Sequence, residues 1–144
     1  MSTIVTCNGC FDGIHPGHLF FLGFCKAQGD KLIVGINSDN YIKKHKREKP
    51  LYNEKQRVKS LMSLGCIKDV VVFHEDTPIE FIKNSKTDIH CNGAEYGKDC
   101  IESNTLNEMG ARLVLIPRTP IWSTSDLKDE SSDIVNKTMK ILLR

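Results

Sequence analysis

A glycine-rich stretch near the N-terminus constrains the fold of this chain more than any other feature. It reads Cys-Asn-Gly-Cys-Phe-Asp-Gly-Ile-His-Pro-Gly-His over residues 7–18. β-Branched and apolar residues at 4–7 precede it, and Pro16 suits the first position of a helix because its φ angle is already helical. The sequence therefore predicts a buried strand over 4–7, a turn over 8–15, which we call the signature turn, and a helix that begins at Pro16.

This strand-turn-helix corner has the features of an anion-binding site. Glycines let the backbone approach a ligand closely, and the first N–H groups of a helix have no partner within the helix. His15 and His18 are three residues apart, so both can face the same way at the helix start. Imidazole N–H donors would add to the partial positive charge of the helix N-terminus, and we expect the corner to bind a polyphosphate.

Two other interpretations of this stretch use its cysteines. Cys7 and Cys10 have the spacing of a redox pair, and with His15 and His18 they would supply the ligand types of a metal cluster. A redox pair usually opens a helix directly, whereas several residues here separate the cysteines from Pro16. A structural zinc site would draw on a second ligand pair downstream, and none has suitable spacing. We therefore expect reduced cysteines that act as small apolar residues, without disulfides.

Apolar runs alternate with helical patterns along the rest of the chain. We expect four further strands, over 31–36, 69–73, 87–91 and 112–116. Helices are expected over 54–64, 78–84 and 100–109, with a last one opening at 123–126, and the segment 37–50 is expected to be a loop. Five strands that alternate with helices, without hairpin signals, predict a Rossmann-like, doubly wound parallel α/β sheet. Ligands bind such sheets at the carboxyl ends of the strands, where the signature turn and the segment 37–50 should meet.

Composition and charge exclude several classes of protein. The 144 residues are 40% hydrophobic and 26% charged, which predicts one ordinary domain over 1–144. No segment approaches the roughly 20 apolar residues of a membrane span and no signal peptide is visible, so we expect a cytoplasmic protein that binds no membrane. The net charge of +2 is too small to favour nucleic-acid binding, and the basic run 43–47 would ordinarily be a solvated loop.

The pattern Gly-x-Phe-Asp-x-x-His-x-Gly-His over residues 9–18 resembles the signature of the cytidylyltransferase-like nucleotidyltransferases. It is complete at each defined position and lies in the strand-turn-helix context that the chemistry requires. The resemblance implies that His15 and His18 contact the phosphates of a nucleoside triphosphate and stabilise the charge that builds up during nucleotidyl transfer. It also assigns to the nucleotide site the remaining signature residues and one neighbouring cysteine: Gly9, Cys10, Phe11, Asp12 and Gly17.

A segment near the C-terminus resembles the second signature of this family. Arg118-Thr119 followed by Ser123-Thr124 matches an arginine and hydroxyl groups that hold the triphosphate at a helix start. Helix capping alone would also explain Ser123 and Thr124. The middle of the segment differs, because it carries Trp122 where a glycine-bearing turn is common. By the resemblance, Arg118 joins the catalytic residues, and Thr119, Ser123 and Thr124 join the nucleotide site.

The basic segment and the helix after it also resemble the family. The resemblance assigns Lys46 to the triphosphate and Lys43 and Arg57 to the acceptor substrate. From the residues alone, Arg57 could form a surface ion pair with Glu54 instead. Further along, Asn92, Gly93 and Glu95 are assigned to the nucleotide and Tyr96 to the acceptor. The relatives usually show Lys or Met at the position of Asn92 and Asp at that of Glu95, so the acceptor could be heptose or another sugar or polyol phosphate.

These resemblances imply a reaction between a nucleoside triphosphate and a sugar or polyol phosphate, with Mg²⁺ bridging triphosphate oxygens. Within the family, the chain is similar to the adenylyltransferases that make ADP-heptose from ATP and heptose 1-phosphate, notably at Glu75-Asp76-Thr77-Pro78. Glycerol-3-phosphate cytidylyltransferases, which make CDP-glycerol from CTP, are the alternative, and a nucleotide-sensing protein is the alternative without catalysis. Asp12 could approach the metal or orient the turn, and no protein ligand for a metal is assigned. The resemblance also implies a homodimer.

Overall fold

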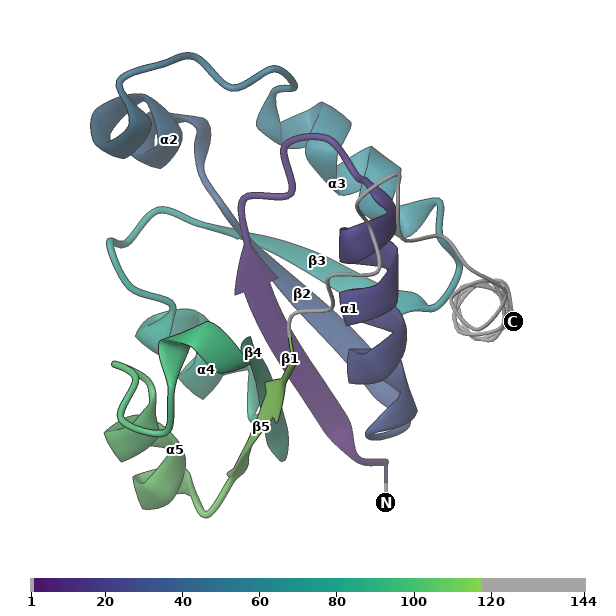
Figure 1. The fold of residues 1–144 in the computed structure, drawn as a ribbon, viewed down its shortest axis with the longest axis vertical. Helices are drawn as coiled ribbons and strands as arrows, with labels where there is room; N and C mark the ends of the chain where they lie inside the picture. Colours follow the sequence, from purple (N-terminus) through teal and green to yellow (C-terminus); the bar gives the residue numbers. More distant parts are fainter. Residues whose placement is uncertain (1, 118–144) are drawn as a thin grey trace.

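Five parallel strands form a single sheet in the computed structural model, which describes residues 2–117 (Figure 1). The strands are β1 (Ile4–Gly9), β2 (Lys31–Asn37), β3 (Ile67–Phe73), β4 (Ile89–Gly93) and β5 (Arg112–Ile116). Their spatial order is β3-β2-β1-β4-β5, and every neighbouring pair is parallel. The predicted Rossmann-like α/β class is confirmed. The order reverses between β1 and β4, and in sheets of this kind ligands bind in a crevice at the carboxyl ends of the two strands at that point.

Helices cover both faces of the sheet. The helices are α1 (Pro16–Ala27), α2 (Asp39–Lys46), α3 (Glu54–Met62), α4 (Ile79–Ser85) and α5 (Ser103–Met109), with a short 3₁₀ turn, η1 (Ala94–Tyr96). Leu22 of α1 and Leu61 of α3 share one apolar core with Val5 of β1. Phe81 of α4 and Leu106 of α5 form the core on the opposite face. Among residues 2–117, no helix has the length and apolarity needed to cross a bilayer.

The sequence predicts a loop over 37–50, and this prediction is wrong because residues 39–46 form α2. The Ser38 side chain caps this helix by accepting a hydrogen bond from the backbone N–H of Tyr41 at 3.1 Å. Asp39 lies in the first turn and the basic run occupies the last, so both signs of charge complement the helix dipole. A cluster of like charges that suggested a solvated loop is thus compatible with a helix C-terminus. Figure 1 shows α2 beyond the carboxyl end of β2.

A buried polar chain links β4 to β1 on the face covered by α4 and α5. His90 is fully buried, and its Nδ1 lies 2.8 Å from Oγ1 of Thr6. Thr6 Oγ1 donates to Thr87 Oγ1 at 2.9 Å, and Thr87 Oγ1 donates to the carbonyl of Ile89 at 2.8 Å. Because Thr6 uses its proton on Thr87, His90 Nδ1 must carry a proton and donate it to Thr6. Burial lowers the pKa of His90 to about 4, so the ring is neutral at pH 7.

We expect the protein to lose stability between pH 6.5 and pH 4 because of His90. The unfolded chain protonates this histidine near its ordinary pKa of 6.5, whereas the folded protein protonates it only near 4. Since each pKa unit corresponds to about 1.4 kcal/mol, His90 should contribute about 3 kcal/mol to this loss.

His90→Asn keeps a donor for Thr6 but does not titrate. Urea unfolding at several pH values should show a weaker pH dependence for this variant. A His74→Asn control, at an exposed position, should behave as wild type; an unchanged dependence in His90→Asn would contradict the assignment.

Candidate active site

His15 and His18 pair at the start of α1. His15 is the residue that caps the helix, and the backbone N–H of His18 donates to its Nδ1 at 3.4 Å. The backbone N–H of His15 donates in turn to Nδ1 of His18 at 3.2 Å. The two rings stack with their centroids 3.8 Å apart. A backbone N–H needs a lone pair to accept its proton, so the proton of each neutral imidazole lies on Nε2.

Electrostatics keep His18 neutral at physiological pH. The pKa of His18 is lowered from 6.5 to about 4, mainly by burial and to a smaller extent by the neighbouring His15, while a backbone hydrogen bond with Gly13 acts in the opposite direction. The first turn of α1 carries no acidic residue that would compete for its N–H groups. The structure therefore presents two imidazoles as proton-bearing donors beside the positive end of a twelve-residue helix.

The signature turn owes its shape to two of the predicted nucleotide-site residues. Phe11 has a φ of 49°, in the left-handed region, and its ring folds back over Gly9. A Cβ atom at position 9 would lie only 3.0 Å from Cε2 of Phe11, tighter than most such contacts, so this close approach favours glycine. The Phe11 ring also lies 5.2 Å from the ring of His18, measured between centroids. Phe11 thus packs between Gly9 and the ring of His18.

Asp12 orients the signature turn. Its Oδ2 accepts the backbone N–H of Leu51 at 2.7 Å, and its Oδ1 accepts that of Tyr52 at 2.8 Å. Of the two roles that the sequence left open, the structure supports the orienting one, because both carboxylate oxygens already hold backbone donors. Within residues 2–117, no group of three or more His, Cys, Asp or Glu side chains is arranged to hold a metal ion.

Arg57 is a buried clamp, and the structure corrects both of its predicted roles. The residue is 1% exposed, so it forms neither a surface ion pair with Glu54 nor an accessible substrate contact. Its Nε donates to the carbonyl of Tyr52 at 3.1 Å, and its Nη1 donates to the carbonyls of Cys10 at 2.9 Å and Asn37 at 2.7 Å. The guanidinium thereby joins the signature turn, the end of β2 and the segment before α3.

Asp39 completes this clamp, and the sequence interpretation gave it no role. Nη2 of Arg57 donates to Asp39 Oδ1 at 2.7 Å. The other oxygen of Asp39 accepts the backbone N–H of Glu54 at 3.2 Å, while Glu54 Oε1 accepts the backbone N–H of Asp39 at 2.7 Å. The starts of α2 and α3 are therefore bound to each other. The Ser38-Asp39 pair, a common helix start, was the available signal for Asp39.

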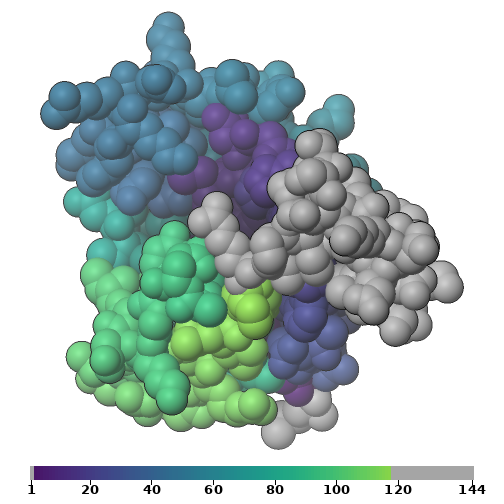
Figure 2. All heavy atoms as spheres, viewed as in Figure 1, coloured from purple at the N-terminus to yellow at the C-terminus, as the bar shows by residue number. Residues whose placement is uncertain are grey.

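The predicted lysines lie on α2, at the same edge of the sheet as the signature turn. Lys43 and Lys46 are both exposed, in the last turn of the helix. His45, between them, pairs with Asp76 at 3.3 Å, which connects α2 to the segment after β3. In the space-filling view, the purple atoms of the N-terminal segment border the blue atoms of α2 (Figure 2).

The predicted residues after β4 lie across the crevice from β1. Asn92 donates from Nδ2 to Glu102 at 3.3 Å and accepts the backbone N–H of Gly93 at 3.2 Å through Oδ1. The Glu95 carboxylate folds over Gly93, where a Cβ atom would lie 2.5 Å from Glu95 Oε2. Tyr96 is 64% exposed. These residues frame the β4 side of the crevice, and their contacts with a ligand stay predictions. Four predicted residues lie outside the described part of the chain: Arg118, Thr119, Ser123 and Thr124.

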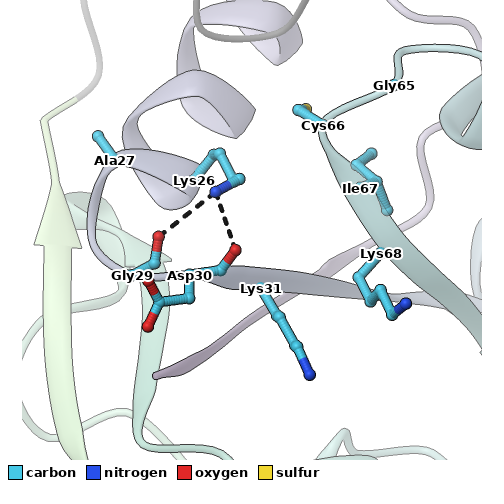
Figure 3. A pocket seen from close by; sticks show the side chains of 9 residues that line it. All are labelled: Lys26, Ala27, Gly29, Asp30, Lys31, Gly65, Cys66, Ile67 and Lys68. Atoms are coloured by element: carbon cyan, nitrogen blue, oxygen red, sulfur yellow. Dashed lines mark hydrogen bonds between the residues drawn. The ribbon is translucent and has the colours of Figure 1, made fainter. Parts of the chain in front are cut away.

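A separate hollow of about 690 Å³ lies at the opposite end of the sheet. Lys26, Lys31 and Lys68 line it near the start of β2 and β3 (Figure 3). Lys26 uses its ammonium group on the backbone, donating to the carbonyls of Gly29 at 3.5 Å and Asp30 at 2.9 Å. Because the signature turn lies at the other end of β1, this hollow is not part of the candidate active site.

Sequence comparisons agree with the motifs. Residues 6–137 match the cytidylyltransferase-like family. The bifunctional protein HldE of Helicobacter pylori strain P12 is 50% identical over 107 residues, which are 73% of this chain and 23% of that protein. HldE of Syntrophotalea carbinolica is 39% identical over 138 residues, covering 91% of this chain and 27% of that protein. The chain thus spans about a quarter of the length of these relatives.

Structural comparisons support the fold. The lipopolysaccharide core biosynthesis protein from Thermoplasma volcanium superposes with a TM-score of 0.67 at 23% identity, over 83% of this chain and 98% of that one. Pantoate-beta-alanine ligase from Francisella tularensis gives a TM-score of 0.59 at 14% identity, over 99% of this chain and 72% of that one. At these identities the likeness concerns the fold alone. The family match over residues 6–137 shows that the chain belongs to the cytidylyltransferase-like family, and the identity to HldE shows that it forms a nucleotidyltransferase-like domain related to that protein.

Proposed function

We propose that this protein transfers a nucleoside monophosphate from a nucleoside triphosphate to a sugar phosphate, with ATP and heptose 1-phosphate as substrates and ADP-heptose and pyrophosphate as products. Family membership and the relation to HldE support the reaction class. The resemblance of Glu75-Asp76-Thr77-Pro78 to the ADP-heptose-forming adenylyltransferases supports the choice of substrates.

The reciprocal cap of His15 and His18 is the observation that carries the proposal. It commits both Nδ1 atoms to backbone donors, which leaves a proton on each Nε2 at the N-terminus of α1. Preorganised N–H donors stabilise charge that develops on transferring phosphoryl groups, and they need no reorganisation during the reaction. A helix N-terminus adds favourable potential for the same anion.

The chemistry requires little from protein side chains beyond positioning and charge stabilisation. An anionic oxygen of the acceptor phosphate attacks the α-phosphorus of the triphosphate in line. The new P–O bond forms as the bond to the β-phosphate oxygen breaks, and that electron pair leaves with pyrophosphate. The nucleophile already carries a negative charge, so no general base is needed. Mg²⁺, when bound, would neutralise triphosphate charge.

The fold suggests where each substrate lies. The nucleotide would occupy the crevice between β1 and β4, the point at which the strand order reverses. The acceptor would approach from the β2 side, where α2 carries Lys43, and Lys46 on the same helix would face the triphosphate. Its phosphate and the triphosphate would then meet over the signature turn.

The test is pyrophosphate release in the presence of Mg²⁺, with ATP and CTP each paired with heptose 1-phosphate and glycerol 3-phosphate. We expect turnover with ATP and heptose 1-phosphate, and loss of turnover in His18→Ala. Turnover confined to CTP and glycerol 3-phosphate would reassign the substrates. Tight triphosphate binding without turnover in any pair would contradict transfer to these acceptors and would favour a nucleotide sensor or another acceptor.

A further inference from the structure

Tyr52 is an exposed aromatic residue whose backbone is held on both sides by charged groups. Its N–H donates to Oδ1 of Asp12 at 2.8 Å, and its carbonyl accepts Nε of Arg57 at 3.1 Å. Hydrogen bonds to ionised partners are stronger than those between neutral groups, so both bonds restrain the residue firmly. Asp12 belongs to the signature turn, and Arg57 is nine-tenths or more buried. The residue that carries the Tyr52 ring is therefore fixed relative to the turn.

The ring of Tyr52 lies beside the signature turn without belonging to the core. Its Cε2 is 3.8 Å from the position that a Cβ atom would take at Gly13. The residue is 47% exposed, and it belongs to neither apolar core of the described chain. An exposed aromatic residue alone needs no explanation. Here, however, the two hydrogen bonds with Asp12 and Arg57 fix the backbone of Tyr52 beside a turn that we expect to bind phosphate, and its ring stays half exposed there.

The side of the turn on which Tyr52 lies indicates which substrate it meets. Tyr52 follows α2 in the chain, and Arg57 connects it to the end of β2 through the carbonyl of Asn37. It is thus on the β2 side of β1, away from the crevice between β1 and β4. Lys43 and Lys46 are on the helix of the same side. An acceptor phosphate bound by Lys43, the lysine that the resemblance assigns to the acceptor, would lie on the same side of β1 as Tyr52.

We propose that Tyr52 determines acceptor specificity by offering its ring as a platform for the carbon ring of a cyclic sugar phosphate. This inference rests on the proposed function. A cyclic sugar presents a flat face of C–H groups that can pack on an aromatic ring, and Tyr adds large apolar contact area while its hydroxyl stays in water. An open-chain polyol phosphate has no such face. Tyr52 therefore favours a ring-form sugar phosphate over glycerol 3-phosphate.

Isothermal titration calorimetry tests this inference independently of turnover. Heptose 1-phosphate, glycerol 3-phosphate and ATP are each titrated into wild type, Tyr52→Ala, Tyr52→Phe and Leu51→Ala. Leu51 is the matched control, since it is 81% exposed and its N–H is also held by Asp12. We expect Tyr52→Ala to weaken heptose 1-phosphate binding about tenfold and to change the other two affinities less than about twofold. Tyr52→Phe and Leu51→Ala should stay within about twofold of wild type for all three ligands.

Other outcomes overturn the inference. Unchanged heptose 1-phosphate binding in Tyr52→Ala would show that the Tyr52 ring does not contact the sugar. A selective loss of ATP affinity in this variant would place the ring at the nucleotide. A loss in Tyr52→Phe equal to that in Tyr52→Ala would assign the effect to the hydroxyl. Wild type that binds no heptose 1-phosphate would also overturn it. If heptose 1-phosphate binding depends on Tyr52 but no pyrophosphate is released, the inference holds and the proposed function fails. If pyrophosphate is released from heptose 1-phosphate and ATP equally in wild type and Tyr52→Ala, the proposed function holds and the inference fails.

Discussion

Replacing His18 with asparagine should lower kcat/KM for pyrophosphate release by about 10²- to 10³-fold, the usual cost of removing one preorganised donor to transition-state charge. Asparagine places an amide oxygen near the position of Nδ1, where it can still accept the backbone N–H of His15. It has no atom at the position of Nε2. The free energy of unfolding should therefore change by less than about 1 kcal/mol, the range of a cap substitution. Steady-state kinetics and urea unfolding measure the two quantities.

Two companion variants make this prediction specific. His18→Gln carries an amide N–H at about the distance of Nε2 and should recover part of the lost rate. His74→Asn, at an exposed histidine after β3, should retain wild-type activity. If His18→Asn lost stability and activity in proportion, His18 would act as a cap alone, and the assignment of its Nε2 to the triphosphate would be wrong.

Replacing Arg57 with methionine should destabilise the protein by about 3–5 kcal/mol, the usual cost of removing one partner of a buried ion pair. Methionine fills much of the same volume but donates no hydrogen bond. The carboxylate of Asp39 and the carbonyls of Cys10, Asn37 and Tyr52 would lose their donor. Each polar group that is buried without a partner adds a desolvation cost. Urea unfolding followed by circular dichroism measures the loss.

A double mutant separates the charge from the carbonyl contacts. Asp39→Asn in the Arg57→Met background removes the uncompensated carboxylate, so it should recover part of the lost stability. Lys55→Met, on the exposed surface of α3, should change stability by less than about 0.5 kcal/mol. A stable Arg57→Met protein with a raised KM for the acceptor would contradict the buried clamp and would restore the substrate contact that the sequence suggested.

Local patterns in the sequence predict most of the fold. Apolar runs such as 31–36 and 112–116 mark strands because both faces of a parallel sheet are covered. Asparagine and glycine mark helix ends. Asn53 starts α3 because its side chain accepts a backbone N–H of the first turn, and Gly110 ends α5 because it adopts a left-handed conformation without steric cost. The histidine pair was also readable, because its spacing and its place at a helix start are local properties.

The contacts that shape the candidate site were not readable, because their partners are distant in the chain. Asp12 bonds to residues about forty positions away, and Arg57 reaches back to Cys10 and Asn37. An arginine beside a basic segment looks like a surface group until the carbonyls around it are known. The helix α2 was predicted as a loop for a similar reason, since a run of cations is compatible with a loop or with the last turn of a helix.

The clamp of Arg57 also limits how far the signature motif can be transplanted. The backbone of Cys10, within the motif, is held by a guanidinium that comes from α3 and that also holds β2. A ten-residue graft into another sheet would carry the two histidines but not the framework that orients their turn. The framework of the turn extends over β1, α1, β2, α2 and α3, so we expect a graft of the ten-residue motif alone to give a scaffold no triphosphate affinity.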